Sequence, residues 1–350
     1  MTHVYPLADD LDDVCSRIGD AWQLLRGERV FITGGTGFVG TWLLETLAWA
    51  NRRFALNTQA VVLSRRPEEF FRKAPHLAND PMFSWQQGDV RDFAVPQGKF
   101  GAVVHAAFDS AAPNGALDSG QTVDTIVGGT RRVLEVARLM QVERFLFVSS
   151  GAVYGRQPPE LERLGESYAG APDVASPNLG AIYGESKRLA EMLTMDAAST
   201  FLPHAAIVRC FAFVGPYLPL DRHFAVGNFL GNLLRGEPLQ VNGDGTPWRS
   251  YLYAADLAEW LWTILLRSPS KCVVNVGSEE AVQIRNLAGM IASLRQPALP
   301  VIIAKQADTQ HPAERYVPDC TTAHILLGLA NRTPLLAALR KTAAWHAQSR

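Results

Sequence analysis

The sequence predicts an α/β fold, in which a Rossmann-type doubly wound parallel sheet is followed by a smaller C-terminal α/β region. Two observations support this prediction. Short apolar runs alternate with helical segments through the first half of the chain, as in right-handed βαβ units whose parallel sheet is buried on both faces. A glycine-rich turn also stands between the first apolar run and the next helical segment, at Gly34–Gly40.

The predicted elements begin with an amphipathic helix over residues 9–26, which ends at Gly27. The alternating segments that follow are RVFITGG (29–35), a helix through TWLLETLAWA (41–50), AVVLSRR (60–66), FSWQQGD (83–89), GAVVHAA (101–107), a helix through RRVLEVARLM (131–140) and RFLFVSS (144–150).

After residue 155 the pattern is less regular. Residues 156–180 are rich in Pro, Gly and polar side chains and predict a long surface loop, which in a compact domain is more often functional than idle. The later predicted elements are a helix over 182–198, a strand over 205–214, a helix near 224–235, the segment 239–253, a helix over 255–266, a strand over 272–277 and an αβα tail that ends near His346.

Composition limits the function classes. The 350 residues are 47% hydrophobic and 19% charged, and 33 basic side chains stand against 34 acidic ones. A net charge of −1 without a basic block gives no electrostatic attraction for nucleic acid or for an anionic membrane, so neither is an expected partner.

The four cysteines are scattered without a CxxC pair, which favours free thiols in a reducing compartment over disulfides or a zinc site. The N-terminus lacks the features of a signal peptide, and no apolar stretch approaches the roughly 20 residues of a membrane span. We therefore expect a cytoplasmic location and no bound metal.

The glycine array Gly34, Gly37 and Gly40 has G-x-x-G-x-x-G spacing between a strand and a helix. Glycines there allow a tight turn and a close approach to a pyrophosphate, whose charge is stabilised by the unpaired N–H groups of the helix N-terminus. The context of strand, turn and helix predicts dinucleotide binding.

The end of the second strand indicates which dinucleotide is bound. Ser64, Arg65 and Arg66 stand where an NAD site usually has an acidic residue for the ribose 2′-hydroxyl. Serine and arginine side chains hydrogen-bond a 2′-phosphate instead, so NADP(H) is the preferred cofactor. If the arginines are only a solvated strand end, NAD(H) remains the alternative.

Asp89 suits an adenine contact, and the small residues Ala106 and Ala107 end the fourth strand where the cofactor lies close, although all three also fit plain loop or packing roles. The predicted cofactor-binding residues are Gly34, Thr36, Gly37, Phe38, Val39, Gly40, Ser64, Arg65, Arg66, Asp89, Val90, Ala106, Ala107, Tyr183 and Lys187.

Tyr183 and Lys187 lie four residues apart in a predicted helix and share one face. A tyrosine, with a pKa near 10, is a poor acid–base at neutral pH unless its phenolate is stabilised, which a lysine one turn away and an oxidised nicotinamide can do. Ser150, at the end of its strand, is placed to hydrogen-bond the same substrate oxygen. These three residues are the predicted catalytic group.

With these motifs the sequence resembles the extended short-chain dehydrogenases/reductases that act on nucleotide sugars, from about residue 28 to 345. The matching segments are TGGTGFVG, SSGAVYG, YGESK, GDGTPWRSYLYAADLA, VNVGS and RYVPDCTTAHILLGL. The resemblance implies that Tyr183 is the acid–base, that Lys187 activates it and binds the nicotinamide ribose, and that Ser150 donates to the substrate carbonyl.

The resemblance also implies a nucleotide-sugar substrate and its binding residues. Arg249 and Arg315 match the two arginines that clamp the sugar-nucleotide diphosphate, and Asn228 matches a residue that contacts it, although surface or packing roles stay open for all three. Members of this family usually form homodimers through a four-helix interface, so a homodimer is expected here. With these assignments the chain divides into a helical extension (1–27), a dinucleotide-binding Rossmann domain (28–212, with 250–276 returning to it) and a substrate-binding region (213–249 and 277–350).

Three departures from the family pattern matter. Ile126 and Ala212 stand where asparagines are usual. Gly151 and Ala152 stand where sugar-nucleotide 4,6-dehydratases have an aspartate and a glutamate that remove water, and neither side chain can carry a proton. The stretch also lacks the cysteine found in some epimerising reductases.

These features disfavour dehydration and leave oxidation or reduction at one carbon. The first hypothesis is NADP(H)-dependent 4-ketoreduction of a nucleotide-linked 4-keto-6-deoxyhexose, with Tyr183 as acid–base. The alternative is an NAD(P)-dependent nucleotide-sugar epimerase that retains its cofactor. A 4,6-dehydratase and a non-catalytic dinucleotide sensor are less favoured, the sensor because it needs no catalytic group.

Overall fold

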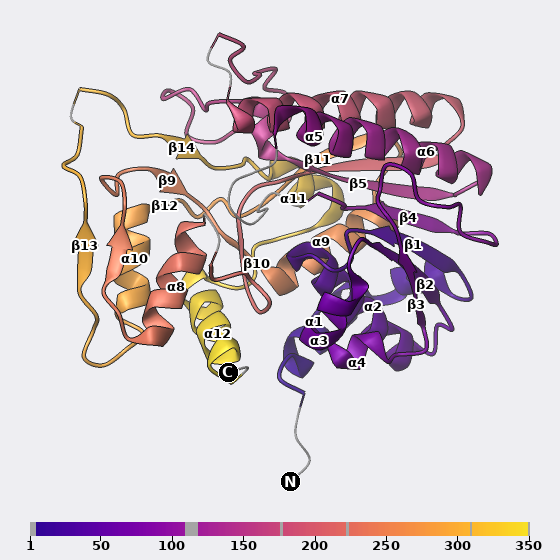
Figure 1. The fold of residues 1–350 in the computed structure, drawn as a ribbon, viewed down its shortest axis with the longest axis horizontal. Coiled ribbons are helices and arrows are strands. Elements are labelled where there is room, and N and C mark those ends of the chain that lie inside the picture. The colour runs from indigo at the N-terminus through magenta and orange to yellow at the C-terminus, as the bar shows by residue number, and fades with distance from the viewer. Residues whose placement is uncertain (1–4, 109–117, 176–177, 222–223, 309, 349–350) are drawn as a thin grey trace.

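A seven-stranded parallel sheet forms the centre of the molecule (Figure 1). The computed structural model describes residues 5–108, 118–175, 178–221, 224–308 and 310–348. From one edge to the other, the strands are β3 (Phe83–Gln87), β2 (Gln59–Ser64), β1 (Arg29–Thr33), β4 (Ala102–His105), β5 (Arg144–Ser150), β6 (His204–Cys210) and β11 (Cys272–Val276). All six neighbouring pairs are parallel. The predicted Rossmann-type α/β fold is confirmed.

Helices cover both faces of this sheet because its strands carry apolar side chains on both sides. Along β1, Val30 and Ile32 belong to one hydrophobic core, and Phe31 between them belongs to the other. Figure 1 shows α5 (Ser119–Val123), α6 (Gly129–Leu139) and α7 (Leu179–Thr200) on one face. On the other face lie α1 (Ala8–Ile18), α2 (Phe38–Phe54), α3 (Pro67–Lys73), α4 (Pro75–Ala78) and α9 (Ala254–Arg267).

Two of the predicted helices differ from the structure for identifiable reasons. The single helix expected over 9–26 is split into α1 and a 3₁₀ helix (Gly19–Leu25), because Gly19 has a φ of +55°, outside the helical range. Helix α7 begins earlier than expected because Asn178 caps it, accepting a hydrogen bond from the Ala181 N–H at 2.9 Å. The extension is fastened to the main domain, where Arg17 contacts Glu259 of α9 at 2.8 Å.

The smaller region contains short sheets and four helices. The strands are β7 (Phe213–Val214) paired with β10 (Leu252–Tyr253), β8 (Leu239–Val241) paired with β13 (Val301–Ile303), and a sheet of β12 (Val282–Gln283), β9 (Trp248–Arg249) and β14 (Arg315–Tyr316). The helices are α8 (Ala225–Arg235), α10 (Ile284–Ala292), α11 (Thr321–Leu327) and α12 (Leu335–Gln348). Strand β11 lies between these segments in sequence and returns to the large sheet, while the exact domain boundaries stay a prediction.

Among the described residues, no helix is both long enough and apolar enough to cross a membrane. The same part of the chain contains no group of three or more His, Cys, Asp or Glu side chains arranged to hold a metal ion.

Candidate active site

The strand order reverses between β1 and β4, so the carboxyl ends of these two strands open a crevice. The glycine loop lies at this point. Gly34 has a φ of +74°, and a Cβ there would lie 2.5 Å from the carbonyl carbon of Ala106. A Cβ at Gly40 would lie 2.2 Å from the Gly34 carbonyl oxygen. Both positions therefore require glycine, and the loop packs directly on the segment after β4.

The loop leads into the N-terminus of α2. Gly37 is the residue before the helix, and no described side chain caps its first turn. The unpaired N–H groups of that turn are therefore available to an anion. The loop fits the pyrophosphate of a dinucleotide, whose nicotinamide would supply hydride transfer. Phe38 and Val39, also predicted to bind the cofactor, are partly buried against the core.

At the end of β2, Ser64 is buried with its hydroxyl 3.3 Å from that of Thr36. Ser64 also accepts a hydrogen bond from the Arg66 N–H at 3.3 Å, and the Arg66 guanidinium contacts Glu69 at 2.9 Å. The structure therefore brings Thr36, Ser64 and the backbone of Arg66 together.

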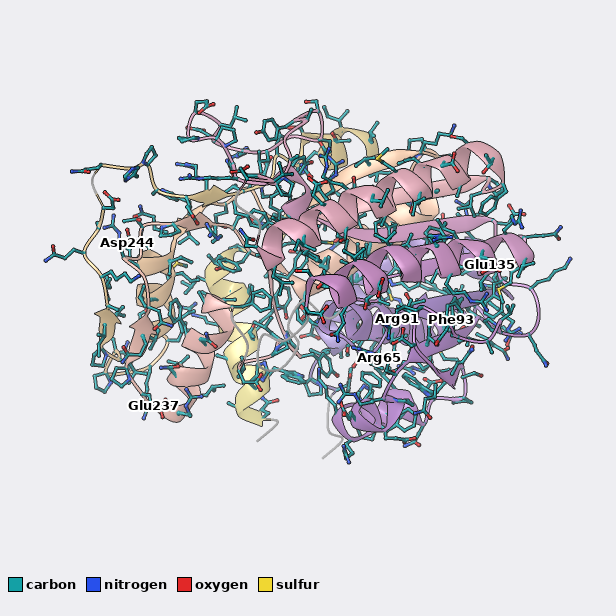
Figure 2. All side chains as sticks on the ribbon, turned by 45° about the horizontal axis from the view of Figure 1, so that its top comes forward. Arg65, Arg91, Phe93, Glu135, Glu237 and Asp244 are labelled. Atoms are coloured by element: carbon teal, nitrogen blue, oxygen red, sulfur yellow. The ribbon has the colours of Figure 1, made fainter. Side chains whose placement is uncertain are left out.

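Asp89, the predicted adenine contact, lies beside two arginines. Its carboxylate accepts hydrogen bonds from Arg91 Nε at 2.8 Å and from a second Arg91 nitrogen at 3.1 Å. The Arg91 hydrogen bond, aided by the charge of Arg65, holds the pKa of Asp89 below its usual range. Arg65 and Arg91 lie close together in Figure 2. Val90 is buried and lies against α6 at Gly129.

The predicted catalytic residues meet between β5 and α7. Lys187 is buried and donates a hydrogen bond to the carbonyl oxygen of Val148 at 2.8 Å. Burial lowers the pKa of Lys187 to about 8. Ser150 lies close enough to Tyr183 to oppose the effect of burial on the pKa of the phenol, and Lys187 Nζ lies 6.0 Å from the centre of the Tyr183 ring. The structure therefore brings Ser150, Tyr183 and Lys187 into one cluster.

Tyr183 is a protonated phenol at neutral pH in this arrangement. Burial raises its pKa to about 12, against an opposing contribution from the Ser150 hydrogen bond. Its ring stacks on Phe108, with ring centroids 4.8 Å apart. Such a group can donate a proton to a substrate oxygen, and a nearby positive charge would favour the phenolate that remains.

His105 lies at the end of β4, beside Ala106 and Ala107. Its two ring nitrogens lie 2.8 Å from the Thr33 hydroxyl and 3.1 Å from the Thr130 hydroxyl. Burial, with a further contribution from the charge of Lys187, lowers the pKa of His105 to about 3. The imidazole is therefore neutral and helps hold β1, β4 and α6 together.

A second tyrosine reaches Ser150 from the far end of the chain. Ser150 opposes the effect of burial on the pKa of Tyr316 of β14, and the Tyr316 ring packs on Phe211 with centroids 4.6 Å apart. A Cβ at Gly151 would lie 2.7 Å from the Tyr316 hydroxyl oxygen. The place that the dehydratase acid would take is thus occupied by a phenol.

The predicted diphosphate-binding arginines lie on adjacent strands, but their side chains project from opposite faces of the small sheet. Arg249 is paired with Tyr316, and Arg315 with Trp248. The Arg249 guanidinium lies on the same face as Glu314, 3.4 Å from its carboxylate. The Arg315 guanidinium lies on the other face, 4.9 Å from the centre of the Trp248 ring. Asn228 is half-buried on α8. The structure therefore does not bring the two guanidinium groups together.

An ion pair between β6 and α7 stabilises the position of this cluster. Arg209 of β6 contacts Glu191 of α7 at 2.7 Å, and the Ser149 hydroxyl donates to Glu191 at 2.5 Å. Arg209 also donates to the Tyr154 hydroxyl at 3.0 Å. This network fixes β5 against α7 and therefore the separation of Ser150 from Tyr183.

Sequence reasoning missed Tyr316, Phe211 and the Glu191–Arg209 pair. Tyr316 follows Arg315 directly in the RYVPD segment, but nothing in that segment indicates the distant serine it contacts. Residues 109–117, between β4 and α5, lie outside the described residues.

The glycine loop at the sheet's switch point defines a dinucleotide-binding α/β enzyme, and comparison with known proteins gives its family. The profile of the NAD dependent epimerase/dehydratase family matches residues 30–277, so the chain belongs to that family. The resemblance to extended short-chain dehydrogenases/reductases that act on nucleotide sugars is thereby confirmed.

One similar sequence is UDP-glucuronic acid decarboxylase 4 of Arabidopsis thaliana, 30% identical over 306 residues. That alignment covers 86% of this chain and 64% of the relative. The chain thus spans less than two thirds of the length of this curated relative.

Solved structures share the fold. The dTDP-glucose 4,6-dehydratase of Streptomyces venezuelae, solved with NAD bound, superposes with a TM-score of 0.76 at 22% identity, covering 92% of this chain and 98% of that one. The UDP-glucuronic acid 4-epimerase of Bacillus cereus, in complex with UDP-glucuronic acid and NAD, gives 0.74 at 20% identity, with 92% and 100% coverage.

Proposed function

We propose that this protein is an NADP(H)-dependent oxidoreductase of nucleotide-linked sugars, and that its reaction is reduction of a 4-keto-6-deoxyhexose at the carbonyl carbon. The observation that carries the proposal is the buried cluster of Ser150, the protonated Tyr183 and Lys187, whose Nζ lies 6.0 Å from the centre of the Tyr183 ring. A neutral phenol supplies the proton that a carbonyl oxygen takes up on reduction. Gly151 and Ala152 supply no carboxylic acid for dehydration.

The preference for NADP(H) is supported by the charges around the end of β2. The charge of Arg65 acts on the Asp89 carboxylate, whose two oxygens are bound by Arg91, so two basic side chains gather around one acid near the end of β2. A 2′-phosphate would be attracted there. The solved relatives described above contain NAD, which keeps NAD(H) as the alternative.

The second candidate is a redox-neutral reaction in which the sugar is oxidised and then reduced at the same site. Epimerisation is one form. Decarboxylation is another form, and the name of the Arabidopsis relative favours it. Oxidation of a uronic acid at C4 makes the compound a β-keto acid, because the C6 carboxylate is then two bonds from the new carbonyl carbon. Such an acid loses carbon dioxide without help from a carboxylic acid side chain of the protein. A 4,6-dehydratase and a non-catalytic sensor are less supported.

On the substrate side, Arg249, Arg315 and Asn228 are proposed to hold the diphosphate. Arg249 is oriented toward the cluster, because its charge acts on Tyr316. To bind the same diphosphate, the Arg315 side chain must move away from the Trp248 ring and pass around the edge strand β14.

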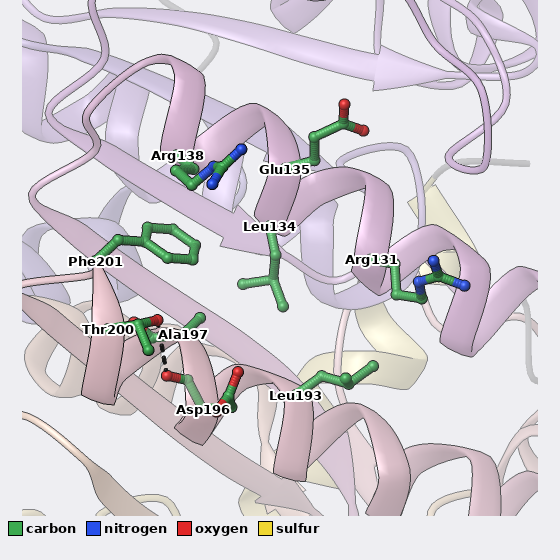
Figure 3. A pocket seen from close by; sticks show the side chains of 9 residues that line it. All are labelled: Arg131, Leu134, Glu135, Arg138, Leu193, Asp196, Ala197, Thr200 and Phe201. Atoms are coloured by element: carbon green, nitrogen blue, oxygen red, sulfur yellow. Dashed lines mark hydrogen bonds between the residues drawn. The ribbon is translucent and has the colours of Figure 1, made fainter.

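The proposed homodimer uses the outer face of α6 and α7. Figure 3 shows a pocket between these helices, lined by Leu134, Leu193 and Ala197 with charged residues around them. Leu189 and Met192 are exposed on the same helix α7. M192E should convert a dimer into monomers in light scattering, with Q348E as the control. An unchanged mass would contradict this interface.

The test of function has two arms. The pure protein is titrated with NADPH and NADH, and a panel of UDP- and dTDP-linked 4-keto-6-deoxy sugars and uronic acids is then added. Stoichiometric loss of NADPH absorbance with a reduced sugar establishes the ketoreductase. An altered sugar without net cofactor consumption establishes the redox-neutral alternative, and release of carbon dioxide identifies decarboxylation.

A further inference from the structure

A buried histidine beside the cofactor crevice belongs to a chain of hydrogen bonds that begins and ends at backbone groups. His105 is the last residue of β4, and its ring is buried. Its Nδ1 lies 2.8 Å from the Thr33 hydroxyl of β1, and its Nε2 lies 3.1 Å from the Thr130 hydroxyl of α6. The Thr130 hydroxyl donates to the Ile126 carbonyl at 2.6 Å, and the Ala107 N–H donates to the Thr33 hydroxyl oxygen at 3.2 Å.

The backbone groups fix the direction of every hydrogen bond in this chain. A carbonyl oxygen only accepts, so the single proton of the Thr130 hydroxyl is donated to Ile126. The Thr130 oxygen must then accept from the histidine, which places a proton on Nε2. The ring is neutral, as its lowered pKa requires, so Nδ1 accepts the proton of the Thr33 hydroxyl. His105 is therefore the Nε2–H tautomer, hydrogen-bonded at both nitrogens.

The Thr33 end of the chain holds the segment that follows β4. The Thr33 carbonyl oxygen accepts from the Ala106 N–H at 3.1 Å, and the Thr33 hydroxyl oxygen accepts from the Ala107 N–H. The same segment adjoins the glycine loop, because a Cβ at Gly34 would lie 2.5 Å from the Ala106 carbonyl carbon and 2.7 Å from the Ala107 nitrogen. The backbone that faces the glycine loop is therefore held by both polar groups of Thr33.

The segment also reaches the catalytic cluster through Phe108, the next residue. The Phe108 N–H donates to the Ala106 carbonyl at 3.0 Å. Its ring stacks on the Tyr183 ring with centroids 4.8 Å apart, and it lies 5.7 Å from Lys187 Nζ. Residues 106–108 therefore lie between the glycine loop and the proposed acid–base.

We propose that His105 is a positioning residue of the cofactor site: as the Nε2–H tautomer it joins Thr130 to Thr33 and thereby holds the Ala106–Ala107 backbone in place for the dinucleotide. Both ends of the chain are backbone groups, so it acts by holding geometry and not by carrying protons. The inference rests on the dinucleotide binding of the proposed function and not on the sugar reaction that follows.

The first test determines the tautomer directly. Long-range 1H–15N spectra of protein labelled with 15N-histidine show which ring nitrogen carries the proton, and H105N assigns the His105 signals. At pH 7.5 the expected result is a protonated Nε2 and a bare Nδ1. T130V removes the acceptor of Nε2–H and should move the proton to Nδ1, where the Thr33 oxygen can accept it. A wild-type proton on Nδ1, or an unchanged tautomer in T130V, overturns the inference.

The second test measures whether the chain positions the cofactor site. T33V removes the hydroxyl that accepts from Ala107 and donates to His105, and should raise the dissociation constant of NADPH about 10-fold in a fluorescence titration. T33S keeps the hydroxyl and should retain near wild-type affinity. T342V is the matched control, because Thr342 is buried on α12 and its hydroxyl donates to the Ala338 carbonyl of its own helix at 2.6 Å.

The outcomes separate this inference from the proposed function. Unchanged NADPH affinity in T33V, weakening in T33S as large as in T33V, or equal weakening in T342V overturns the positioning role while the proposed function stands. If T33V does not fold, the same titration of T130V decides the role, since the altered tautomer should also weaken NADPH binding. Wild-type protein that binds neither NADPH nor NADH overturns both.

Discussion

The two sides of the crevice are built in different ways. The proposed pyrophosphate part of the cofactor side is a single strand-to-helix turn, Gly34–Gly40, in which glycine backbone replaces side chains at the tightest contacts. The hydroxyl cluster on the substrate side is assembled from Ser150, Tyr183 and Tyr316, which come from three segments far apart in sequence. A local motif therefore specifies the first side, and only the tertiary fold specifies the second.

The largest expected effect is a loss of catalysis that leaves cofactor binding intact. Y183F removes the proposed proton donor and should lower kcat about 1,000-fold, within the range of general acid–base catalysis. The dissociation constant of NADPH, measured by fluorescence titration, should stay nearly unchanged because the glycine loop is untouched. Turnover at the wild-type rate would contradict the role of Tyr183 in catalysis.

The second prediction is a substitution in the glycine loop that should weaken cofactor binding. Gly34→Ala places a methyl group 2.5 Å from the Ala106 backbone at a φ of +74°, and should lower the free energy of unfolding by at least about 2 kcal/mol and weaken NADPH binding. Denaturant unfolding and cofactor titration measure both quantities.

A matched control is Gly289→Ala in the middle of α10, where a Cβ meets no atom within 4 Å. It should leave cofactor binding unchanged and stabilise the protein by up to about 1 kcal/mol. Equal losses in the two variants would show that the glycine loop is not specially constrained.

The same contrast explains how much the sequence could predict. The alternation of strands and helices, the glycine turn and the Tyr183–Lys187 spacing follow from periodicity and local motifs. The structure contains the alternation, the turn before α2 and both residues on α7. The relation between Gly151 and Tyr316 could not be predicted, because it depends on how β14 pairs with β9. From the sequence, Gly151 shows only that an acid is missing and not what fills its place.

The arginines give a second example. Sequence reasoning could assign Arg249 and Arg315 to one diphosphate, but it could not show that paired two-residue strands send them to opposite faces. The alternation of side chains along a strand is predictable only once the register is known.

An acid-stability measurement examines the cofactor side further. The pKa of His105 is lowered to about 3 in the fold and is about 6.5 in an unfolded chain. Between these values the unfolded state binds the additional proton, so stability falls as pH decreases below 6.5. At pH 5 the expected loss is about 2 kcal/mol relative to pH 7.5.

The check is urea unfolding at both pH values. H105N should reduce the loss between pH 7.5 and pH 5, whereas H311Q, at an exposed histidine, should keep it. An equal pH dependence in wild type and H105N would mean that other groups cause the acid sensitivity.

The smallest expected effect concerns the outer end of the cofactor side, where side chains and not the backbone set the preference. R65A removes a positive charge that acts on Asp89 and should weaken NADPH binding about 10-fold, the equivalent of about 1.4 kcal/mol. NADH lacks the 2′-phosphate, so its affinity should change little. R285A, on α10 of the smaller region, is the control for general charge effects. Equal weakening of NADPH and NADH in R65A would show that Arg65 does not select between them, and would shift the choice of cofactor toward NAD(H) and the redox-neutral reaction.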